Sequence, residues 1–223
     1  VICQKPVKTK KMKMKMKKID SRVVMAKNWR DIGGLFFGGL KGMAVLASLI
    51  FASPGMAASG YPFVPSDFDI PSSLETKNYR LRMLSVHDLV KDFDAVISSS
   101  EKLREVWPDS GWPLGLTLEG NLIDLGWHQR EFTTRRSFAY TVVTLDETRV
   151  LGCVYINPTR KKNYDAEIYL WTRTSEKETD PSDAQLMNTV ENWVAQEWPF
   201  LSPAFPGKKT PWNVWNQLDE EAR

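Results

Sequence analysis

The chain has 223 residues, of which 42% are hydrophobic and 26% charged, proportions typical of a globular protein rather than a disordered one. The net charge of +3 averages two unlike parts, because residues 1–58 hold 12 of the 30 Lys and Arg but only 2 of the 27 Asp and Glu. The remainder is acidic, which argues against a surface that binds a nucleic-acid backbone. Cys3 and Cys153 lie one in each part, so the sequence excludes a disulfide framework within the body of the chain.

A metal site is not expected either. The two histidines, His87 and His128, have no spacing typical of metal ligands and fall on different predicted helices. Cys153 stands in an apolar run, residues 150–156, and we expect it to pack as a small buried hydrophobic residue.

Residues 1–58 form a basic, apolar leader. Lysine alternates with methionine over residues 8–18, and an apolar run of about ten residues follows at 43–52, too short to span a bilayer but right for a signal peptide. Small residues then precede a cleavage point after Ala57 or Ala58. This pattern predicts export or membrane anchoring, with membrane contact through the leader. The alternative is translation from Met25 or Met56, which leaves a cytoplasmic protein.

The rest of the chain divides into three parts. Residues 59–75 are rich in Pro and Ser and are predicted to be an extended arm, residues 76–207 form the predicted domain, and residues 208–223 form a tail. The tail carries Trp212 and Trp215. These two side chains pack either on the domain or on a partner, and we expect them to pack on the domain.

The first half of the domain is predicted to hold one strand and three helices. Residues 79–84 alternate with period two, as in a strand, and Ser85 is placed to cap a helix that runs to about residue 97. A short helix is expected from about 100 to 107. Thr117 is placed to cap a longer helix of about fifteen residues. Its apolar side chains at helical spacing are expected to face the core: Leu118, Leu122, Leu125 and Phe132.

The second half is predicted to begin with a hairpin of strands at 138–145 and 149–156, joined by residues 146–148. A third strand follows at 165–174. Asp180 then caps a helix that ends before Pro199, and residues 200–205 are expected to form a last short strand.

The order of these elements resembles the core of the GNAT acetyltransferase superfamily. The similarity lies in three strand sequences, FAYTV at 138–142, LGCVYI at 151–156 and DAEIYLW at 165–171, and it covers residues 76–207. It identifies the chain as a reduced or divergent member. The resemblance implies an α/β (α+β) fold in which a central, mostly antiparallel sheet carries helices on both faces.

The resemblance also implies an activity, the transfer of an acetyl group from acetyl-CoA, as co-substrate, to an unknown amine on a small molecule or peptide. The residues that match the family's cofactor-binding strand are Leu170, Trp171, Thr172 and Arg173, followed by the phosphate-binding loop at 174–183. Glu167 matches the position of a general base, and Tyr169 is the second catalytic candidate. The alternatives for these two are a solvent-facing strand carboxylate and a packed aromatic ring.

The sequence departs from the family in the phosphate-binding loop. Residues 175–181 contain no glycine and three acids, and acids there repel a diphosphate. No tyrosine follows Tyr169. The alternative function is therefore a catalytically inactive GNAT-like domain, exported or membrane-anchored, that binds a ligand or protein partner. A homodimer is compatible with both functions, whereas nucleic-acid binding is not expected.

Overall fold

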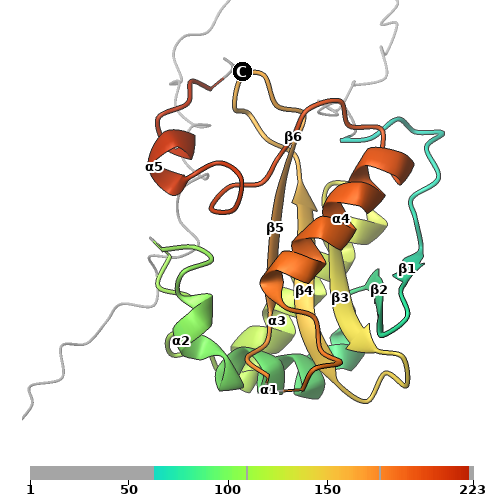
Figure 1. Ribbon diagram of the computed structural model, residues 1–223, viewed down its shortest axis with the longest axis vertical. Helices are drawn as coiled ribbons and strands as arrows, with labels where there is room; N and C mark the ends of the chain where they lie inside the picture. Colours follow the sequence, from blue (N-terminus) through green and yellow to red (C-terminus); the bar gives the residue numbers. More distant parts are fainter. Residues whose placement is uncertain (1–62, 109, 176, 221–223) are drawn as a thin grey trace, which may run out of the picture. The chain divides into compact units, whose positions relative to one another are not determined.

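The computed structural model describes residues 63–220 except 109 and 176, and these form one sheet with helices on both faces (Figure 1). The strands stand in chain order across the sheet, from β1 to β6. Neighbouring strands are antiparallel except β5 and β6, which are parallel. The strands are β1 (Ser73–Glu75), β2 (Tyr79–Met83), β3 (Phe138–Thr144), β4 (Val150–Asn157), β5 (Ala166–Thr172) and β6 (Pro203–Ala204).

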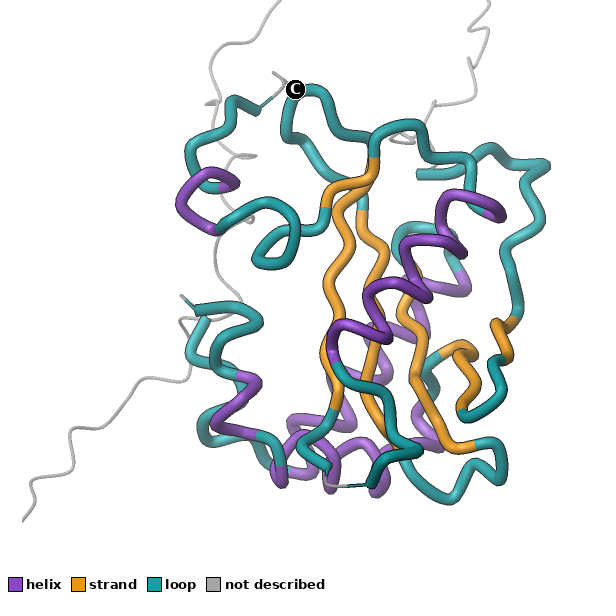
Figure 2. Tube along the Cα trace, in the orientation of Figure 1, coloured by secondary structure: helices purple, strands orange, loops and turns teal. Residues whose placement is uncertain are grey.

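The helices lie on opposite sides of this sheet. In Figure 2, the long α4 crosses in front of the strands, and α1 and α3 lie behind them. The helical elements are the 3₁₀ turn η1 (Val86–Asp88), α1 (Leu89–Ser98), α2 (Ser100–Leu103), α3 (Leu118–Thr133), α4 (Asp183–Glu197) and α5 (Trp212–Trp215). The expected fold class, a mostly antiparallel sheet with helices on both faces, is confirmed.

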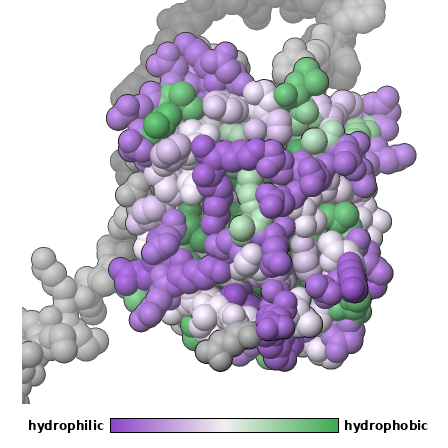
Figure 3. All heavy atoms as spheres, in the orientation of Figure 1, coloured by the Kyte–Doolittle hydropathy of each residue, from purple (hydrophilic) through white to green (hydrophobic). Residues whose placement is uncertain are grey.

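Because successive side chains of a strand point to opposite faces of the sheet, the core consists of two clusters, one on each face. On β5, Ile168 and Leu170 point into the cluster beneath α4, whereas Trp171 points into the cluster beneath α1 and α3. Cys153 is fully buried in the second cluster, as its apolar neighbours predict. The outer surface on the α4 side is largely hydrophilic (Figure 3), which fits a helix that buries one face only.

The start of α4 differs from the prediction, because Ser182 and not Asp180 caps the helix. The Ser182 hydroxyl accepts a hydrogen bond from the Gln185 N–H at 3.2 Å, and the Gln185 side chain accepts one from the Ser182 N–H at 2.8 Å. This reciprocal pair satisfies two backbone donors at once. Asp180 is engaged elsewhere, in an ion pair with Arg149 at 2.9 Å.

The core-facing side of α3 also differs from the prediction. Leu125 is buried as expected, but Leu118 and Leu122 are exposed, and Asn121 is buried instead. The Asn121 side-chain amide donates a hydrogen bond of 2.9 Å to the carboxyl group of Asp92 on α1. A buried polar pair of this kind is costly to break, so it fixes the rotation of the helix and turns the leucines outward.

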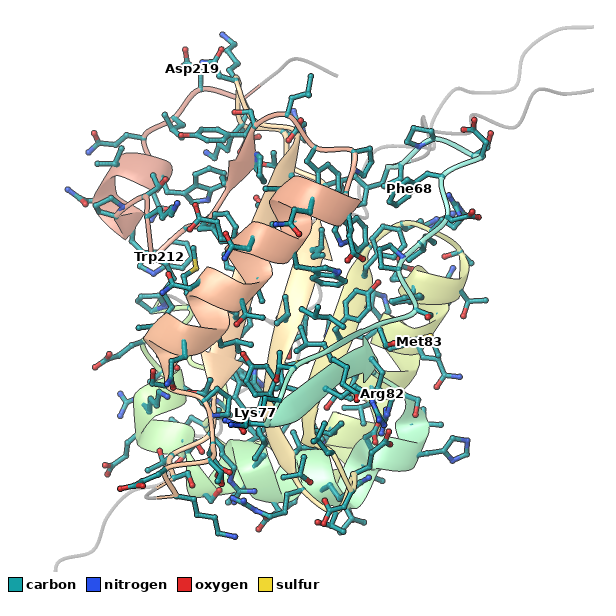
Figure 4. The ribbon with its side chains drawn as sticks, turned by 45° about the vertical axis from the view of Figure 1, so that its right-hand side comes forward. Phe68, Lys77, Arg82, Met83, Trp212 and Asp219 are labelled. Carbon is teal, nitrogen blue, oxygen red and sulfur yellow. The ribbon has the colours of Figure 1, made fainter. Side chains whose placement is uncertain are left out.

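The arm and the tail both pack on the domain. The Tyr140 hydroxyl donates to the Pro71 carbonyl at 2.6 Å, and the Phe68 ring lies 5.7 Å from Trp198. Trp212 stacks on Tyr169 with ring centroids 6.0 Å apart and planes at 10°. Figure 4 shows Phe68 and Trp212 on opposite sides of α4. The expectation that the tail docks on the domain is confirmed.

Membrane spans and metal clusters are both absent from the part of the chain that the structure describes. Between residues 63 and 220, leaving aside 109 and 176, no helix is both long and apolar enough to cross a bilayer. The same residues contain no group of three or more His, Cys, Asp or Glu side chains placed to hold a metal ion. The predicted signal peptide and the candidate start at Met25 or Met56 lie outside the described residues.

Candidate active site

Strand β5 has an open edge. β6 pairs with it only at Ala166 and Glu167, and the chain then turns away. On the other side, the Arg173 N–H donates to the Leu151 carbonyl of β4 at 2.8 Å. Because backbone groups alternate in an antiparallel ladder, Leu170 and Thr172 direct their N–H and C=O groups away from β4. Among the described residues, no strand pairs with this part of β5.

A cleft of about 200 Å³ opens along this edge. Its floor is formed by β5, one wall by the end of α2 and the residues after it, and the other wall by the turn before α5. The lining residues are Lys102, Glu105, Val106, Tyr169, Leu170, Asp183, Pro206, Gly207, Lys208 and Trp212.

Gly207 holds the second wall in place. Its φ of +72° lies in the left-handed region, and a Cβ atom there would stand 2.5 Å from Nε1 of Trp212. Only glycine permits both this backbone conformation and the approach of the indole ring. The Phe205 carbonyl closes the turn by accepting hydrogen bonds from the N–H groups of residues 208, 209 and 210.

A second hollow, of about 580 Å³, lies beside the first, at the N-terminus of α4. It is bounded by the loop after β5 and shares Lys102 and Asp183 with the cleft. The two hollows therefore lie on either side of one ion pair, in which the Lys102 ammonium contacts the Asp183 carboxylate at 2.8 Å.

Asp183 occupies the position where an anionic ligand would meet β5. Its carboxylate accepts hydrogen bonds from the Thr172 hydroxyl at 2.5 Å and the Thr172 N–H at 3.2 Å, and it pairs with Lys208 at 3.1 Å. Burial opposes ionisation of this carboxyl, but the hydrogen bonds from Lys102 and Thr172 and the charges of Lys102 and Lys208 lower its pKa to about 2. Asp183 is therefore an anion throughout the physiological range.

These residues fit one part of acetyl-CoA and not another. The open backbone of Leu170 beside an apolar wall suits the amide groups of a pantetheine arm. The diphosphate fits poorly, because the Asp183 carboxylate already occupies the Thr172 N–H. In addition, residues 174–182 contain no glycine, and Pro181 has no N–H to donate. Arg149, which lies beside this loop, is paired with Asp180.

Glu167 and Tyr169 share one face of β5. Tyr169 lines the cleft, and Glu167 lies two residues before it, where β5 pairs with β6. Burial raises the pKa of Glu167 above its usual range, and hydrogen bonds from the hydroxyls of Thr159 and Tyr169 and the charge of Lys161 oppose this rise. Burial, together with the Glu167 charge and hydrogen bond, raises the pKa of Tyr169. The Tyr169 hydroxyl therefore stays protonated and holds the Glu167 carboxylate in place.

The other predicted cofactor residues do not all reach the cleft. Trp171 is fully buried, and by the alternation of the ladder its backbone faces β4. The Arg173 guanidinium lines the second hollow but contacts Asp94 at 3.1 Å and Ser98 at 3.2 Å on α1. Leu170 and Thr172 are the two of this group that the structure brings together at the open edge.

Sequence reasoning missed several residues of the cleft. No sequence pattern marks Lys102 or Lys208, and Asp183 is expected only as the last residue of the phosphate-binding loop at 174–183. Lys102 lies 70 residues before Thr172 in the chain, and no local pattern marks their contact, in which the Lys102 ammonium donates to the Thr172 carbonyl at 2.8 Å. The tail carries one signal: Trp212 and Trp215 are large apolar residues in a short segment that also holds many polar side chains.

Neither protein-family profiles nor curated proteins match the sequence. Solved structures that match are acetyltransferases. One is the ribosomal-protein-S5-alanine acetyltransferase from Vibrio fischeri, with 18% identity over 56% of this chain and 67% of that one, at a TM-score of 0.45. Another is the Salmonella typhimurium acetyltransferase that modifies the N-terminal serine of ribosomal protein L7/L12, with 11% identity over 56% and 69%, at 0.44.

A third match is the microcin C7 self-immunity acetyltransferase in complex with acetyl-CoA and AMP, with 10% identity over 57% of this chain and 67% of that one, at a TM-score of 0.41. These structures are acetyltransferases, as the resemblance drawn from the sequence implies. At these identities the likeness concerns the course of the chain, and fold alone does not fix activity. The activity of this chain therefore has to be inferred from the geometry of its cleft.

Proposed function

We propose that this domain is an N-acyltransferase that takes an acetyl group from acetyl-CoA and passes it to an amine on a small molecule or peptide. The observation that carries the proposal is the open edge of β5 at Leu170, which borders a cleft instead of a neighbouring strand. Backbone groups left free inside a protein need partners, and an extended ligand with amide groups supplies them. Such a ligand would lie along β5 as an additional strand does.

Five residues in or beside the cleft have a role in this proposal. The Leu170 N–H and C=O hold the amide-containing arm of the donor, and Trp212 and Val106 exclude water from it. The bound cofactor would supply a thioester: its C–S bond breaks as the new C–N bond forms, and the thiolate of coenzyme A leaves and takes up a proton from solvent. Glu167 takes the proton that the amine loses as the new C–N bond forms, and Tyr169 orients Glu167 for that step.

A specific observation favours a second candidate function. The Asp183 carboxylate, together with its partners Lys102 and Lys208, fills the position where a diphosphate would bind. A domain with this arrangement is also suited to bind a ligand without phosphate groups and to perform no chemistry. The two functions make different predictions for acetyl-CoA.

Calorimetric titration of the purified protein with acetyl-CoA distinguishes them. Under the first proposal, acetyl-CoA binds with a Kd in the micromolar range, and thiol release is observed when a panel of amines is added. Absence of binding at millimolar acetyl-CoA, in a sample whose folding is verified by circular dichroism, would leave the non-catalytic function.

The role of Glu167 is tested by Glu167→Gln, which keeps the size of the side chain but cannot accept the proton. We expect kcat to fall by about a hundredfold with KM little changed, and wild-type activity to rise with pH through the raised pKa of Glu167. Glu101→Gln, at an exposed glutamate of α2, is the matched control and should leave kcat unchanged. Equal rates for Glu167→Gln and the wild type would remove Glu167 from the reaction.

A further inference from the structure

Helix α3 presents apolar side chains to solvent. Leu118, Leu122, Ile123 and Trp127 are 45%, 42%, 58% and 48% exposed. Helices of globular proteins usually bury their apolar side and expose their polar side. Exposed apolar groups that gather on one element mark an interaction surface.

Residues that lie at equal or nearly equal distances on either side of a point near the middle of α3 are complementary in charge or size. Counted from the midpoint between residues 124 and 125, Glu119 and Arg130 are equally far away on opposite sides. Leu122 and Gly126 lie at nearly equal distances, as do Ile123 and Trp127. A second α3 that packs antiparallel about this midpoint therefore places the two members of each pair opposite one another on the two copies. Their positions along the helix axis then differ by no more than one helical rise, about 1.5 Å.

These pairs also match in chemistry. Glu119 carries a negative charge and Arg130 a positive one, and the Arg130 side chain is 62% exposed. Leu122 meets a glycine, which adds no side chain of its own to the contact. A Cβ atom at Gly126 would lie 3.8 Å from Val86 Cγ1, so Val86 borders this point of the helix surface. A parallel arrangement would instead bring each charge against its own copy, which is unfavourable.

We propose that the chain forms a two-fold symmetric homodimer through antiparallel packing of α3 on α3. Ile123 of each copy packs on Trp127 of the other, Leu122 packs against Gly126 and the neighbouring Val86, and Glu119 pairs with Arg130 at both ends. α3 packs on α1 and β3, on the face of the sheet opposite α4, and the cleft lies at the far edge of β5. The dimer leaves the cleft open and does not depend on the proposed activity.

Sedimentation of the full chain tests the association, and two charge reversals test its geometry. We expect a dimer for the wild type. Glu119→Arg brings two arginine side chains together across the interface, and Arg130→Glu brings two glutamates together, so each variant should dimerise at least about tenfold more weakly. An equimolar mixture of the two variants restores opposite charges at both ends of the interface and should form a heterodimer in preference to either homodimer.

Glu101→Arg, at an exposed position on α2, is the control and should dimerise like the wild type. Circular dichroism verifies that each variant is folded. A wild-type chain that sediments as a monomer at about 100 µM, far above the Kd of a specific dimer, overturns the proposal and assigns the α3 surface to a different partner. A dimer that survives both charge reversals, or a mixture that associates no better than either variant alone, overturns the antiparallel α3 geometry.

Discussion

The Asp183 carboxylate determines how readily the cleft can bind an anionic ligand. Its carboxylate takes up the Thr172 N–H and both neighbouring lysines, Lys102 and Lys208. A ligand with a diphosphate must displace these contacts before it can use the same groups. The contacts of this single side chain are thus the main obstacle to the binding of the diphosphate of acetyl-CoA. The open edge of β5 otherwise suits the amide groups of that ligand.

Removal of this charge is predicted to strengthen cofactor binding. Asp183→Asn keeps the shape of the side chain but frees Lys102 and Lys208, so the Kd for acetyl-CoA should fall by about tenfold in calorimetry. Asp180→Asn removes a charge from the same loop without touching Thr172 and is the control, with a smaller expected effect. Weaker binding by Asp183→Asn than by the wild type would show that Asp183 helps to hold the ligand.

The same carboxyl group predicts a dependence of stability on pH. Because the pKa of Asp183 is lowered in the folded state to about 2, its contribution to stability is present above about pH 4 and is lost as the pH falls toward 2. We expect Asp183→Asn to be less stable than the wild type at pH 7, by about 1 kcal/mol since the carboxylate is partly exposed. Urea unfolding at pH 7 and pH 3 should show this difference shrinking.

Gly207 offers a test of the wall that carries Trp212. Gly207→Ala combines an unfavourable positive φ with a clash against the indole ring, and should lower the free energy of unfolding by about 2–3 kcal/mol. Gly111→Ala has the same φ of +72° but nothing within 4 Å, so it isolates the backbone effect at about 1 kcal/mol. Equal losses in urea unfolding would mean that Trp212 is not held against Gly207.

At the scale of elements, α1 and α3 are joined by a buried polar contact instead of an apolar seam. Asp92 is almost fully buried, and this burial raises the pKa of its carboxyl group to about 6, although the hydrogen bond from Asn121 opposes the rise. The contact orients α3 so that Leu118 and Leu122 face outward. One orientation of α3 about its axis thus buries Asn121 against Asp92 and leaves the leucines on the outer surface.

Asp92→Asn is predicted to stabilise the protein above pH 6. A carboxyl whose pKa is raised on folding favours the folded state at low pH, and this benefit is lost as the pH rises from about 4 to about 6. Asparagine keeps an oxygen that accepts from Asn121 and carries no charge, so the gain at pH 7 should be about 2 kcal/mol. Thermal unfolding at pH 7 and pH 4 should show the gain at the higher pH only; a loss at both would contradict the burial argument.

At the scale of the whole molecule, the folded unit extends beyond its sheet. The arm before β1 contributes Phe63, Phe68 and Ile70 to the cluster beneath α4, and Arg135 donates hydrogen bonds of 2.8 Å to the carbonyls of Pro65 and Phe68. The arm therefore belongs to the structural core, although its Pro- and Ser-rich sequence is typical of a linker.

A pair of truncations tests this role. A chain that begins at residue 72 keeps β1 but lacks the arm before it, and should lose several kcal/mol of stability, since Phe63, Phe68 and Ile70 leave the core. A chain that begins at residue 59 keeps the arm and should unfold at the wild-type temperature in calorimetry. If the two truncated chains unfold at the same temperature, the arm does not stabilise the domain.

The sequence alone determined the strands and helices from β2 to β6 and their order to within a few residues, but it predicted neither β1 in the arm nor α5 in the tail. Period-two alternation in β2 and β5 and the cap at Thr117 are local signals, and they need no knowledge of distant residues. The mostly antiparallel sheet with helices on both faces is what the family resemblance carried by that order implied. The buried environment of Cys153 followed from its apolar neighbours. The roles of Glu167 and Tyr169 remain predictions.

Only the tertiary structure decided how the elements turn and what fills the cleft. The rotation of α3 depends on the contact between Asp92 and Asn121, and the anion position depends on Lys102 and Thr172, which are 70 residues apart. Neither the exposed leucines nor the Asp183 carboxylate at the edge of β5 could therefore be predicted from local patterns. Hydrogen bonds and ion pairs between distant residues leave no periodic trace in a sequence, whereas burial of a whole face does.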